Sequence, residues 1–180
     1  PDRMLFHQRA LHAGTYILTD GHIEKLHTKT ERTISPLVYP AWHPSGRYVA
    51  FSTNDTKQDF HLSDANRVEV FDNRSDVVLY DVEKHEVVTA PHLSSEENME
   101  TFPAFSPDGR RLYFCSAPAC LMPESYREIR YNLQSIAFDP EKRSFGQKID
   151  TLYNANEEGR SAKFPRVSPD GRFLMYTVSD

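Results

Sequence analysis

The amino-acid sequence predicts an all-β protein made of repeated four-stranded antiparallel units. A nine-residue stretch recurs three times, at Tyr39–Arg47, Phe102–Arg110 and Phe164–Arg172. The glycine of each copy stands at position 46, 109 or 171, so the repeat spacing is 63 and then 62 residues. Between the copies, short apolar segments alternate with turn residues, which is typical of proteins built from many short strands.

Each copy of the recurring stretch predicts a hairpin turn. Proline fixes the backbone at the first corner, serine or aspartate suits the second, and glycine accepts the left-handed conformation that follows. The turn residues are Pro44, Ser45 and Gly46, then Pro107, Asp108 and Gly109, then Pro169, Asp170 and Gly171. We interpret the recurring aspartates, and the arginines Arg47, Arg110 and Arg172, as structural rather than as a site, because aspartate in a turn bonds to nearby backbone.

The segment after each glycine predicts a strand that is buried on both faces. The third and fifth residues past glycine are apolar in every copy, and the positions between them are also largely apolar. Sheets stacked face against face produce this pattern, whereas a sheet with one solvated face would alternate more cleanly.

Further hairpins are predicted at residues 15–27, 77–89 and 133–152. Together with the recurring stretches, these hairpins define a repeat domain at residues 15–180. It contains two complete units, 39–90 and 102–152, and a half unit at each end, 15–27 and 164–177. Four short antiparallel strands repeated in sequence describe a β-propeller blade. Residues 1–14 are a lead-in segment for which we expect about two helical turns.

The recurring stretches resemble the turn of TolB-like β-propellers, whose WD-like repeats carry Pro-x-aromatic-Ser-Pro-Asp-Gly followed by an apolar strand. His43 and Ser45 depart from this pattern in the first copy, and Val167 departs from it in the third. The resemblance implies about three blade equivalents of a six- to eight-bladed ring. It also implies a non-enzymatic binding or scaffolding module of the bacterial envelope, periplasmic or otherwise extracytoplasmic, whose partners are proteins or peptides. We favour a fragment of a longer propeller, because an open end would leave unpaired strand edges; the alternative is that two chains pair their half blades into a six-bladed ring.

Composition argues against two classes of partner. The 26 acidic and 21 basic residues give a net charge of -5 and are well mixed, so the chain lacks the basic field that nucleic acid requires. Apolar runs are too short to cross a bilayer, which needs about 20 residues. We therefore expect neither a nucleic-acid partner nor a membrane span.

Two insertions between the second and third strands of the blades, at residues 54–76 and 117–131, predict the binding face. Insertions at one position of a repeat emerge on one side of the assembly, and that side often binds. Aromatic and cationic residues are favoured at interfaces. The candidates of this kind are Phe60, His61, Phe71, Tyr126, Arg127, Arg130 and Tyr131.

The first insertion is also acidic, and oxygen ligands of this kind are those that calcium takes. Its candidate ligands are Asp55, Asp59, Asp64, Asn66, Asp72, Asn73 and Asp76. The glycine and glutamate that a calcium loop places at its sixth and twelfth positions do not follow Asp64, so we favour a solvated loop without a metal.

Cys115 and Cys120 leave two alternatives open. Their spacing permits a small disulfide loop in an oxidising compartment, and equally permits a buried thiol beside an exposed one. A zinc site would need two further ligands nearby.

Known catalytic motifs are absent from the sequence, so we expect no enzyme. Two alternatives come from the resemblance: a propeller domain of a prolyl oligopeptidase-like serine peptidase, and a propeller joined to a c-type haem segment. The haem signature Cys-x-x-Cys-His is missing, and the early histidines His7, His12, His22 and His27 are interpreted as surface residues.

Overall fold

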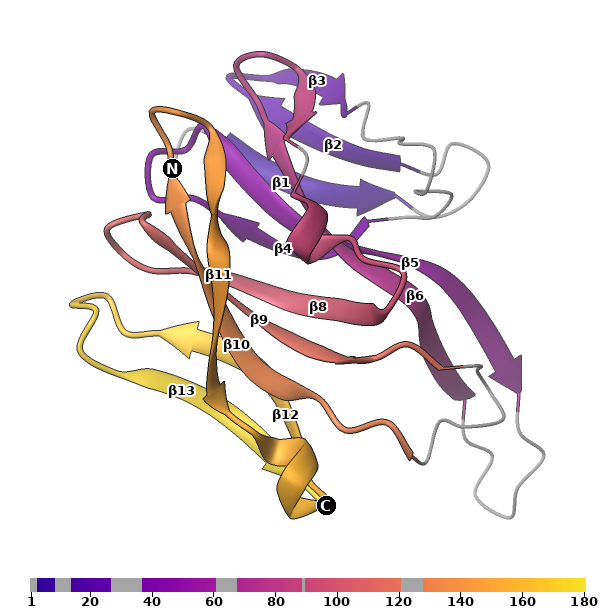
Figure 1. Cartoon of the computed structure of the whole chain (residues 1–180). Helices are drawn as coiled ribbons and strands as arrows, with labels where there is room; N and C mark the ends of the chain where they lie inside the picture. Colours follow the sequence, from indigo (N-terminus) through magenta and orange to yellow (C-terminus); the bar gives the residue numbers. More distant parts are fainter. Residues whose placement is uncertain (1–2, 9–13, 27–36, 61–67, 89, 121–127) are drawn as a thin grey trace.

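The computed structural model describes residues 3–8, 14–26, 37–60, 68–88, 90–120 and 128–180, which form four antiparallel sheets. The sheets follow one another in chain order, with the N-terminal sheet and the C-terminal strand pair at opposite ends of the array (Figure 1). This arrangement confirms the predicted fold class, an all-β array of four-stranded blades.

The first sheet corrects the prediction for the lead-in segment. It contains β1 (Arg3–Gln8), β2 (Gly14–Thr19) and β3 (His22–Lys25), paired in that order. The expected helical turns are wrong, because β1 pairs antiparallel with β2 from Arg3 opposite Thr19 to Gln8 opposite Gly14. A helix this short is marginal alone, whereas the strand gains ladder hydrogen bonds and packs Leu5 against the core. β1 also occupies the place beside β2 that a partner strand would need in a ring of two chains.

Two complete blades follow, each with its four strands in simple sequential order. The first blade contains β4 (Leu37–Trp42), β5 (Tyr48–Phe60), β6 (Val68–Asp81) and β7 (Glu86–Val88). The second contains β8 (Asn98–Phe105), β9 (Arg111–Pro118), β10 (Asn132–Asp139) and β11 (Ser144–Tyr153). β5 and β6 stay paired as far as Phe60 opposite Val68, so the first insertion extends the hairpin of this blade.

The chain ends in a two-stranded sheet of β12 (Ser161–Val167) and β13 (Leu174–Ser179). Short 3-10 helices connect the sheets at η1 (Pro91–Leu93) and η3 (Ala155–Glu158). Gly159 ends η3 with a φ of 69°, a conformation that glycine adopts without strain.

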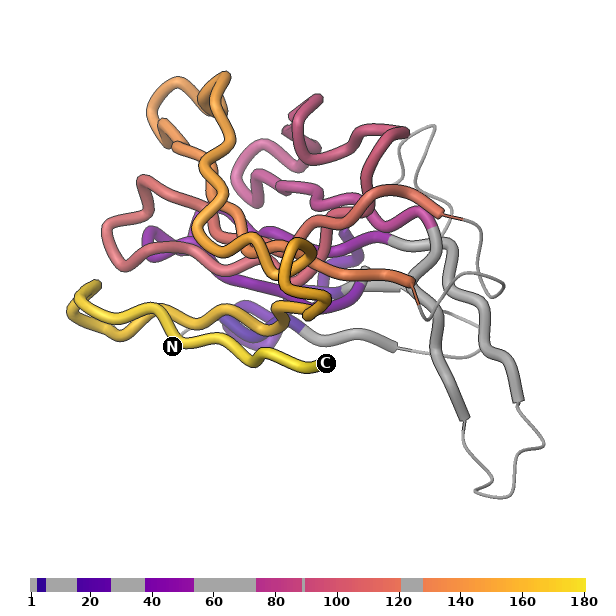
Figure 2. The backbone as a smooth tube through the Cα atoms, turned by 60° about the horizontal axis from the view of Figure 1, so that its bottom comes forward, coloured from indigo at the N-terminus to yellow at the C-terminus, as the bar shows by residue number. Residues whose placement is uncertain are grey.

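The first strands of successive blades, β4, β8 and β12, lie beside one another. The tube in Figure 2 shows the sheets stacked behind one another, with each blade extending outward from these strands. Three apolar clusters fill the spaces between sheets, one per pair of neighbours. Val49 and Phe51 face Ile17 of the first sheet, Tyr48 and Leu79 face Phe114 of the next blade, and Phe102 and Leu133 face Ala162 of the last sheet.

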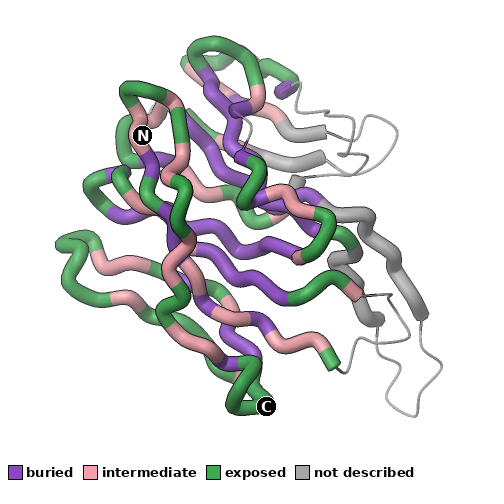
Figure 3. Tube along the Cα trace, in the orientation of Figure 1, coloured by how far each residue is buried: buried purple, intermediate pink, exposed green. Residues whose placement is uncertain are grey.

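Burial follows the expectation of strands covered on both faces. The four consecutive residues from Tyr48 to Phe51 are all buried. In Figure 3 the buried backbone runs through the inner strands of the two complete blades, whereas β13 is mostly exposed.

The recurring turns are held by their own side chains. Ser106 Oγ donates to Asp108 Oδ1 at 2.5 Å, and the Arg110 amide donates to the same oxygen at 3.0 Å. Ser168 and Asp170 repeat this arrangement at 2.6 Å. These hydrogen bonds lower the pKa of both aspartates, with the serine hydroxyl as the largest cause. The aspartates therefore have the turn role that their spacing predicts.

An aromatic residue begins each recurring stretch and occupies an unusual backbone conformation. Tyr39, Phe102 and Phe164 have φ of 52°, 56° and 54°, and the strand pairing shifts register beside each of them. Bulky residues rarely adopt positive φ, so these bulges carry strain. Their rings form one cluster across the blades, with centroids 4.6 Å apart for Tyr39 and Phe102, 4.4 Å apart for Phe102 and Phe164, and 6.3 Å apart for Tyr39 and Phe164.

Candidate binding cleft

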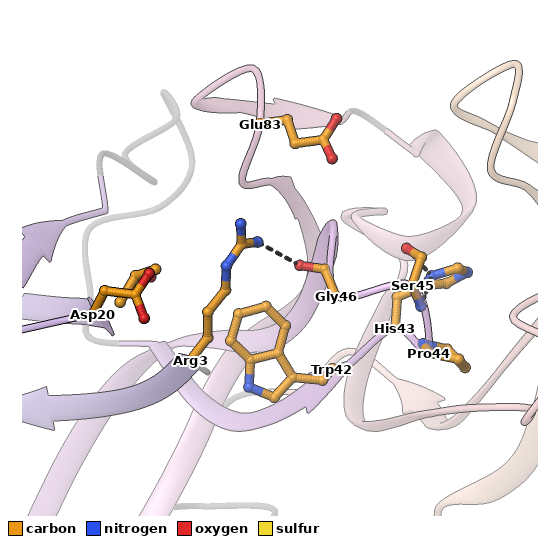
Figure 4. A pocket seen from close by; sticks show the side chains of 9 residues that line it. Arg3, Asp20, Trp42, His43, Pro44, Ser45, Gly46 and Glu83 are labelled. Atoms are coloured by element: carbon orange, nitrogen blue, oxygen red, sulfur yellow. Dashed lines mark hydrogen bonds between the residues drawn. The ribbon is translucent and has the colours of Figure 1, made fainter. Parts of the chain in front are cut away.

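A cleft of about 820 Å³ opens between the first sheet and the first complete blade. Figure 4 shows its walls: Arg3 and Asp20 come from the first sheet, Trp42 and the Pro44–Gly46 turn from the β4–β5 hairpin, and Glu83 from the turn after β6. The turns that frame it belong to hairpins at the opposite end of the strands from the two insertions. The cleft therefore lies away from the face that the insertions predict.

Arg3 is held across the cleft by the neighbouring blade. Its Nη1 donates to the Gly46 carbonyl at 3.1 Å, which leaves the other guanidinium donors directed into the cleft space (Figure 4). Arg3 is exposed, so the contact orients the side chain rather than removing it from solvent. Guanidinium groups bind carboxylates through paired N–H donors, so the remaining donors suit an acidic group or a peptide carbonyl.

Trp42 forms the base of the cleft. The indole is half-buried, packs against the apolar cluster that includes Val49 and Phe51, and makes no hydrogen bond with the residues that the structure describes. A tryptophan with one packed face and one open edge combines apolar area with a polar N–H. Such residues often dominate binding at interfaces.

Two carboxylates flank the indole. Asp20 lies in the two-residue turn between β2 and β3 with a φ of 47°, and within the described ranges its carboxylate has no ion pair. Glu83 Oε2 lies 3.4 Å from Arg47 Nε, and the Glu83 side chain is 60% exposed. With Arg3, these groups give the cleft both signs of charge around an aromatic base.

A second hollow of about 570 Å³ adjoins the cleft and shares Arg3, Asp20 and Trp42 with it. Its further walls are Met4, Leu5 and Leu18, so this end is apolar. The combined space could hold an extended segment with one apolar and one polar side chain. Such amphipathic lining is typical of sites that fix orientation through a few polar groups.

His43 and Ser45 form part of the cleft wall and are 2.7 Å apart at Nδ1 and Oγ. The Ser45 amide donates to Nδ1, so Nε2 carries the proton and donates to the Gly109 carbonyl at 3.0 Å. Burial lowers the pKa of His43 and outweighs the opposing effects of Gly109 and Asp108. In the other two repeats a serine and an aspartate occupy these two places, so we interpret the pair as turn structure rather than as an activated nucleophile.

A buried carboxylate ties the two complete blades together beside the cleft. Asp81 accepts from Arg47 Nη2 at 2.9 Å and lies 2.8 Å from Arg143 Nε of the next blade, and Arg143 also pairs with Glu86. Burial raises the pKa of Asp81. The hydrogen bonds from Arg47 and the Lys84 amide, together with the positive charges of Arg47 and Arg143, lower it by more, so the pKa of Asp81 lies below its usual value. Tyr48 adds a hydrogen bond to the Pro140 carbonyl at 2.7 Å.

The residues predicted on the insertions are largely not brought together. His61, Tyr126 and Arg127 lie outside the described residues. Phe60 and Phe71 belong to β5 and β6, where Phe60 pairs with Val68 and Phe71 with Lys57, and their side chains also lie outside the description. These positions remain a prediction.

Arg130 and Tyr131 are engaged within the fold. Arg130 Nε donates to the Gly159 carbonyl at 2.7 Å. Tyr131 is 9% exposed and packs against Phe102, with ring centroids 6.4 Å apart. This burial corrects the expectation that Tyr131 belongs to an accessible binding surface.

The cysteines are both free thiols in the structure. Cys115 is buried, and burial raises its pKa to about 12, while Cys120 is partly exposed. This arrangement corresponds to the second alternative, a buried thiol beside a more accessible one.

Most of the candidate calcium ligands of the first insertion lie outside the described residues. The side chains of Asp55, Asp59, Asp72 and Asn73, and all of Asp64 and Asn66, lie outside the description, while Asp76 is buried. Among the described residues no group of three His, Cys, Asp or Glu could hold a metal ion.

Comparison with solved structures identifies the fold. A protein assigned as TolB in Agrobacterium tumefaciens superposes with a TM-score of 0.62 at 16% identity, over 99% of this chain and 51% of the other. The chain has a TolB-like β-propeller fold. The tricorn protease also superposes, with a TM-score of 0.54 at 16% identity over 97% of this propeller chain and 14% of the protease.

The propeller thus spans about half the length of the TolB structure that it matches. No family model matches the sequence, and no curated protein matches it. Among the described residues, no helix has the length and apolar character to span a membrane.

Sequence reasoning missed the residues that line the cleft. Arg3 lies in the segment expected to be helical, and Asp20 lies inside the hairpin predicted at residues 15–27. Trp42 was counted as part of the recurring stretch, although it is the one tryptophan of the chain and stands where the other copies have Phe105 and Val167. The difference in residue type at this position of the repeat was the signal in the sequence that could have pointed to the cleft.

Proposed function

We propose that this propeller is a non-enzymatic binding module that captures a peptide segment of a partner protein in the cleft around Arg3 and Trp42. The observation that supports it is the cleft itself, which places an indole, a guanidinium and two carboxylates around about 820 Å³. The adjoining apolar hollow extends it to the length of a short extended segment. Aromatic and arginine side chains in such a setting supply most of the affinity of protein interfaces.

Trp42 makes the test direct. Because it is the one tryptophan of the chain, its fluorescence, excited at a wavelength that the tyrosines do not absorb, reports on the cleft. Peptides selected from a random displayed library should change Trp42 emission saturably as they bind. Replacing Trp42 by Phe removes this signal, and Trp42→Ala should weaken the same peptides by about 2 kcal/mol when binding is measured by calorimetry.

Ile23→Ser is the matched control, because Ile23 is 65% exposed on β3 and lies outside the cleft. It should leave peptide affinity unchanged. Selected peptides that bind Trp42→Ala as tightly as the wild-type chain would show that the cleft is not the binding site.

The envelope location belongs to the same proposal and is supported by the TolB-like fold. Fractionation of the source cells, followed by immunodetection of the native protein, tests it. Recovery with periplasmic markers is the expected result, and recovery with the cytoplasm would contradict it.

A second candidate is the propeller domain of a larger peptidase, favoured by the superposition on part of the tricorn protease. In that role the cleft would handle peptides for an attached catalytic domain. The mass of the native polypeptide decides between the two, since the peptidase role requires a hydrolase domain of roughly 200 residues or more on the same chain.

A further inference from the structure

The wall of the cleft contains a buried histidine that is hydrogen-bonded to the turn beside it. His43 is 4% exposed, whereas Pro44 and Ser45, which follow it, are exposed. The Ser45 amide donates to His43 Nδ1 at 3.1 Å, and Ser45 Oγ lies 2.7 Å from the same nitrogen. A ring nitrogen accepts a hydrogen bond only when it carries no proton. The observed turn therefore requires the neutral form of His43.

The same turn holds Arg3 in place through the peptide group that joins Gly46 and Arg47. The N–H of this group donates to Ser45 Oγ at 3.2 Å. Its carbonyl accepts from Arg3 Nη1 at 3.1 Å. Contacts thus run without a gap from the His43 ring through Ser45 to the guanidinium that crosses the cleft (Figure 4). The charge of a buried ring is connected in this way to a side chain of the cleft.

Protonation of His43 would break this arrangement at a defined atom. With a proton on Nδ1, the ring still donates to Ser45 Oγ, because a hydroxyl is both donor and acceptor. The Ser45 amide has no such alternative, since its N–H would face a second N–H at 3.1 Å. Two donors at this distance repel each other, and the amide must turn to solvent to find an acceptor. Ser45 is exposed, so the turn is free to move outward and to take the Gly46 carbonyl with it.

The surroundings of the ring keep it neutral at neutral pH. Three strands cover it with aromatic side chains, which are Tyr48 of β5, Phe105 of β8 and Phe138 of β10. The β8–β9 turn contributes the Gly109 carbonyl and the Asp108 carboxylate, which both favour the charged ring, but burial lowers the pKa of His43 by more. The pKa of Asp108 lies below its usual value, so this carboxylate stays charged in the range where His43 takes up its proton.

We propose that the cleft releases its peptide at mildly acidic pH, because protonation of His43 displaces the Pro44–Gly46 turn and frees Arg3. This inference rests on the proposed capture of a peptide in the cleft and gives that capture a control. By linkage, a peptide that prefers the cleft with neutral His43 binds less tightly as the pH falls. Its affinity is constant above about pH 6.5 and decreases below it, by at most about tenfold per pH unit, since one proton is taken up.

A second histidine beside the cleft provides the competing explanation. His85 lies in the turn between β6 and β7, and its Nδ1 is 2.6 Å from Glu24 Oε1 of β3. This exposed pair joins the same two sheets that frame the cleft. Protonation of His85 strengthens its attraction to Glu24, so it would hold the sheets together rather than release a ligand.

The test uses peptides selected on the intact chain at about pH 7.5 that contain no histidine, so that their own charge is nearly constant down to about pH 5. Binding is measured by calorimetry at both pH values, and circular dichroism verifies the native sheet at each. The wild-type chain should bind about threefold to tenfold more weakly at the lower pH.

The double variant His43→Ser with Ser45→Asp separates the imidazole from all other titrating groups. In the second blade, Asp108 Oδ1 accepts from Ser106 Oγ and from the Arg110 amide. The introduced carboxylate would hold the corresponding amide of the first blade in the same way, without titrating in this range. The ratio of the affinities at the two pH values should then be close to one.

Arg3→Gln tests the route from the ring to the ligand. In the wild-type chain this change should weaken the peptide about threefold or more at the higher pH, and should have little further effect at the lower pH, where Arg3 is already released. In the double variant it should weaken the peptide at both pH values. His85→Gln is the control for the competing histidine and should retain the pH dependence of the wild-type chain.

A measurement on the chain alone tests the pH control without any peptide. In isotope-labelled protein followed by nuclear magnetic resonance, the His43 ring nitrogens report the midpoint of protonation. The Arg3 Nε–H signal, identified by its loss in Arg3→Gln, reports the contact with Gly46. Both signals should shift with the same midpoint in the wild-type chain, and the Arg3 signal should stay constant in the double variant.

Three outcomes would overturn the inference. They are equal affinity at the two pH values, higher affinity at the lower pH, and an Arg3 signal that does not follow the midpoint of His43. Peptides that bind Trp42→Ala as tightly as the wild-type chain would instead contradict the proposed capture. In that case the resonance titration would still decide whether His43 controls Arg3.

Discussion

At the scale of single residues, His43 stands where the other two copies of the repeat have serine, and its side chain contacts the next blade. Its ring fills the space beside Gly109 and packs edge-on against Tyr48, Phe105 and Phe138, with centroids 5.0 to 5.8 Å away. A Cβ built on Gly109 would lie 2.2 Å from His43 Nε2. The glycine is therefore required twice, once by its φ of 70° and once by the imidazole.

Gly109→Ala tests this double requirement, with Gly46→Ala as its matched control. Both glycines have similar φ, 70° and 72°, but nothing lies within 4 Å of a Cβ at Gly46. Gly46→Ala should cost about 1 kcal/mol of unfolding free energy from backbone strain alone. Gly109→Ala should cost roughly 2 to 4 kcal/mol in urea denaturation, because the His43 ring must also move. Equal losses would show that the imidazole contact is unimportant.

The state of His43 should also make stability depend on pH. Burial holds its folded-state pKa below the ordinary value of 6.5, so the neutral ring stabilises the fold. This contribution is complete above about pH 6.5 and is lost as the pH falls toward the lower folded-state pKa. The melting temperature should therefore decrease between neutral and mildly acidic pH.

The double variant His43→Ser with Ser45→Asp restores the Ser-Pro-Asp-Gly turn of the other copies and removes the imidazole. It should lose the His43 part of the pH dependence. It should also cost about 1 to 3 kcal/mol at neutral pH, because the Gly109 carbonyl loses its donor. An unchanged pH profile would show that the pH dependence does not come from His43.

At the scale of the structural element, the aromatic cluster of Tyr39, Phe102 and Phe164 links three first strands at their strained bulges. Phe102 is the middle ring and is 7% exposed, whereas Phe164 is 45% exposed. Phe102→Ala should cost about 3 to 5 kcal/mol of unfolding free energy, as large-to-small changes at packed aromatics do. Phe164→Ala is the comparison at the same place in the repeat, and its loss should be about half as large or less. Equal losses in thermal denaturation would mean that the buried Phe102 ring contributes no more to the aromatic cluster than the exposed Phe164 ring.

The elements also show where local patterns mislead. The segment of β1 was expected to be helical because its apolar residues are compatible with either period, and the pairing with β2 that decides between them depends on residues further along the chain. The hairpins at the recurring stretches were predictable, because their turn residues act within a few positions of one another. Contacts between blades, such as Arg143 with Asp81, follow no local rule and become visible when the sheets are stacked.

At the scale of the whole molecule, the repeat spacing was sufficient to predict the propeller architecture but not the location of the cleft. The binding face was expected at the insertions, because insertions at one position of a repeat emerge on one side of the assembly. The cleft arises instead where the Asp20–Gly21 turn, the Pro44–Gly46 turn and Glu83 converge from consecutive sheets. A repeat pattern identifies the residues that occupy the same position in each blade. The cleft depends instead on residues, such as Trp42, that differ from their counterparts in the other repeats.

The contact between His43 and Gly109 has a consequence for how such an array can be built or rearranged. A blade that carries the Ser-Pro-Asp-Gly turn places no imidazole against the glycine of the next turn, so the two complete blades are not interchangeable modules. Duplicating, deleting or reordering one of them by recombination would leave a junction with either an unfilled space or a displaced ring. The side chains at the boundary between the blades therefore fit one order of the blades. After any such exchange, further substitutions at the new junction would be needed to restore the packing.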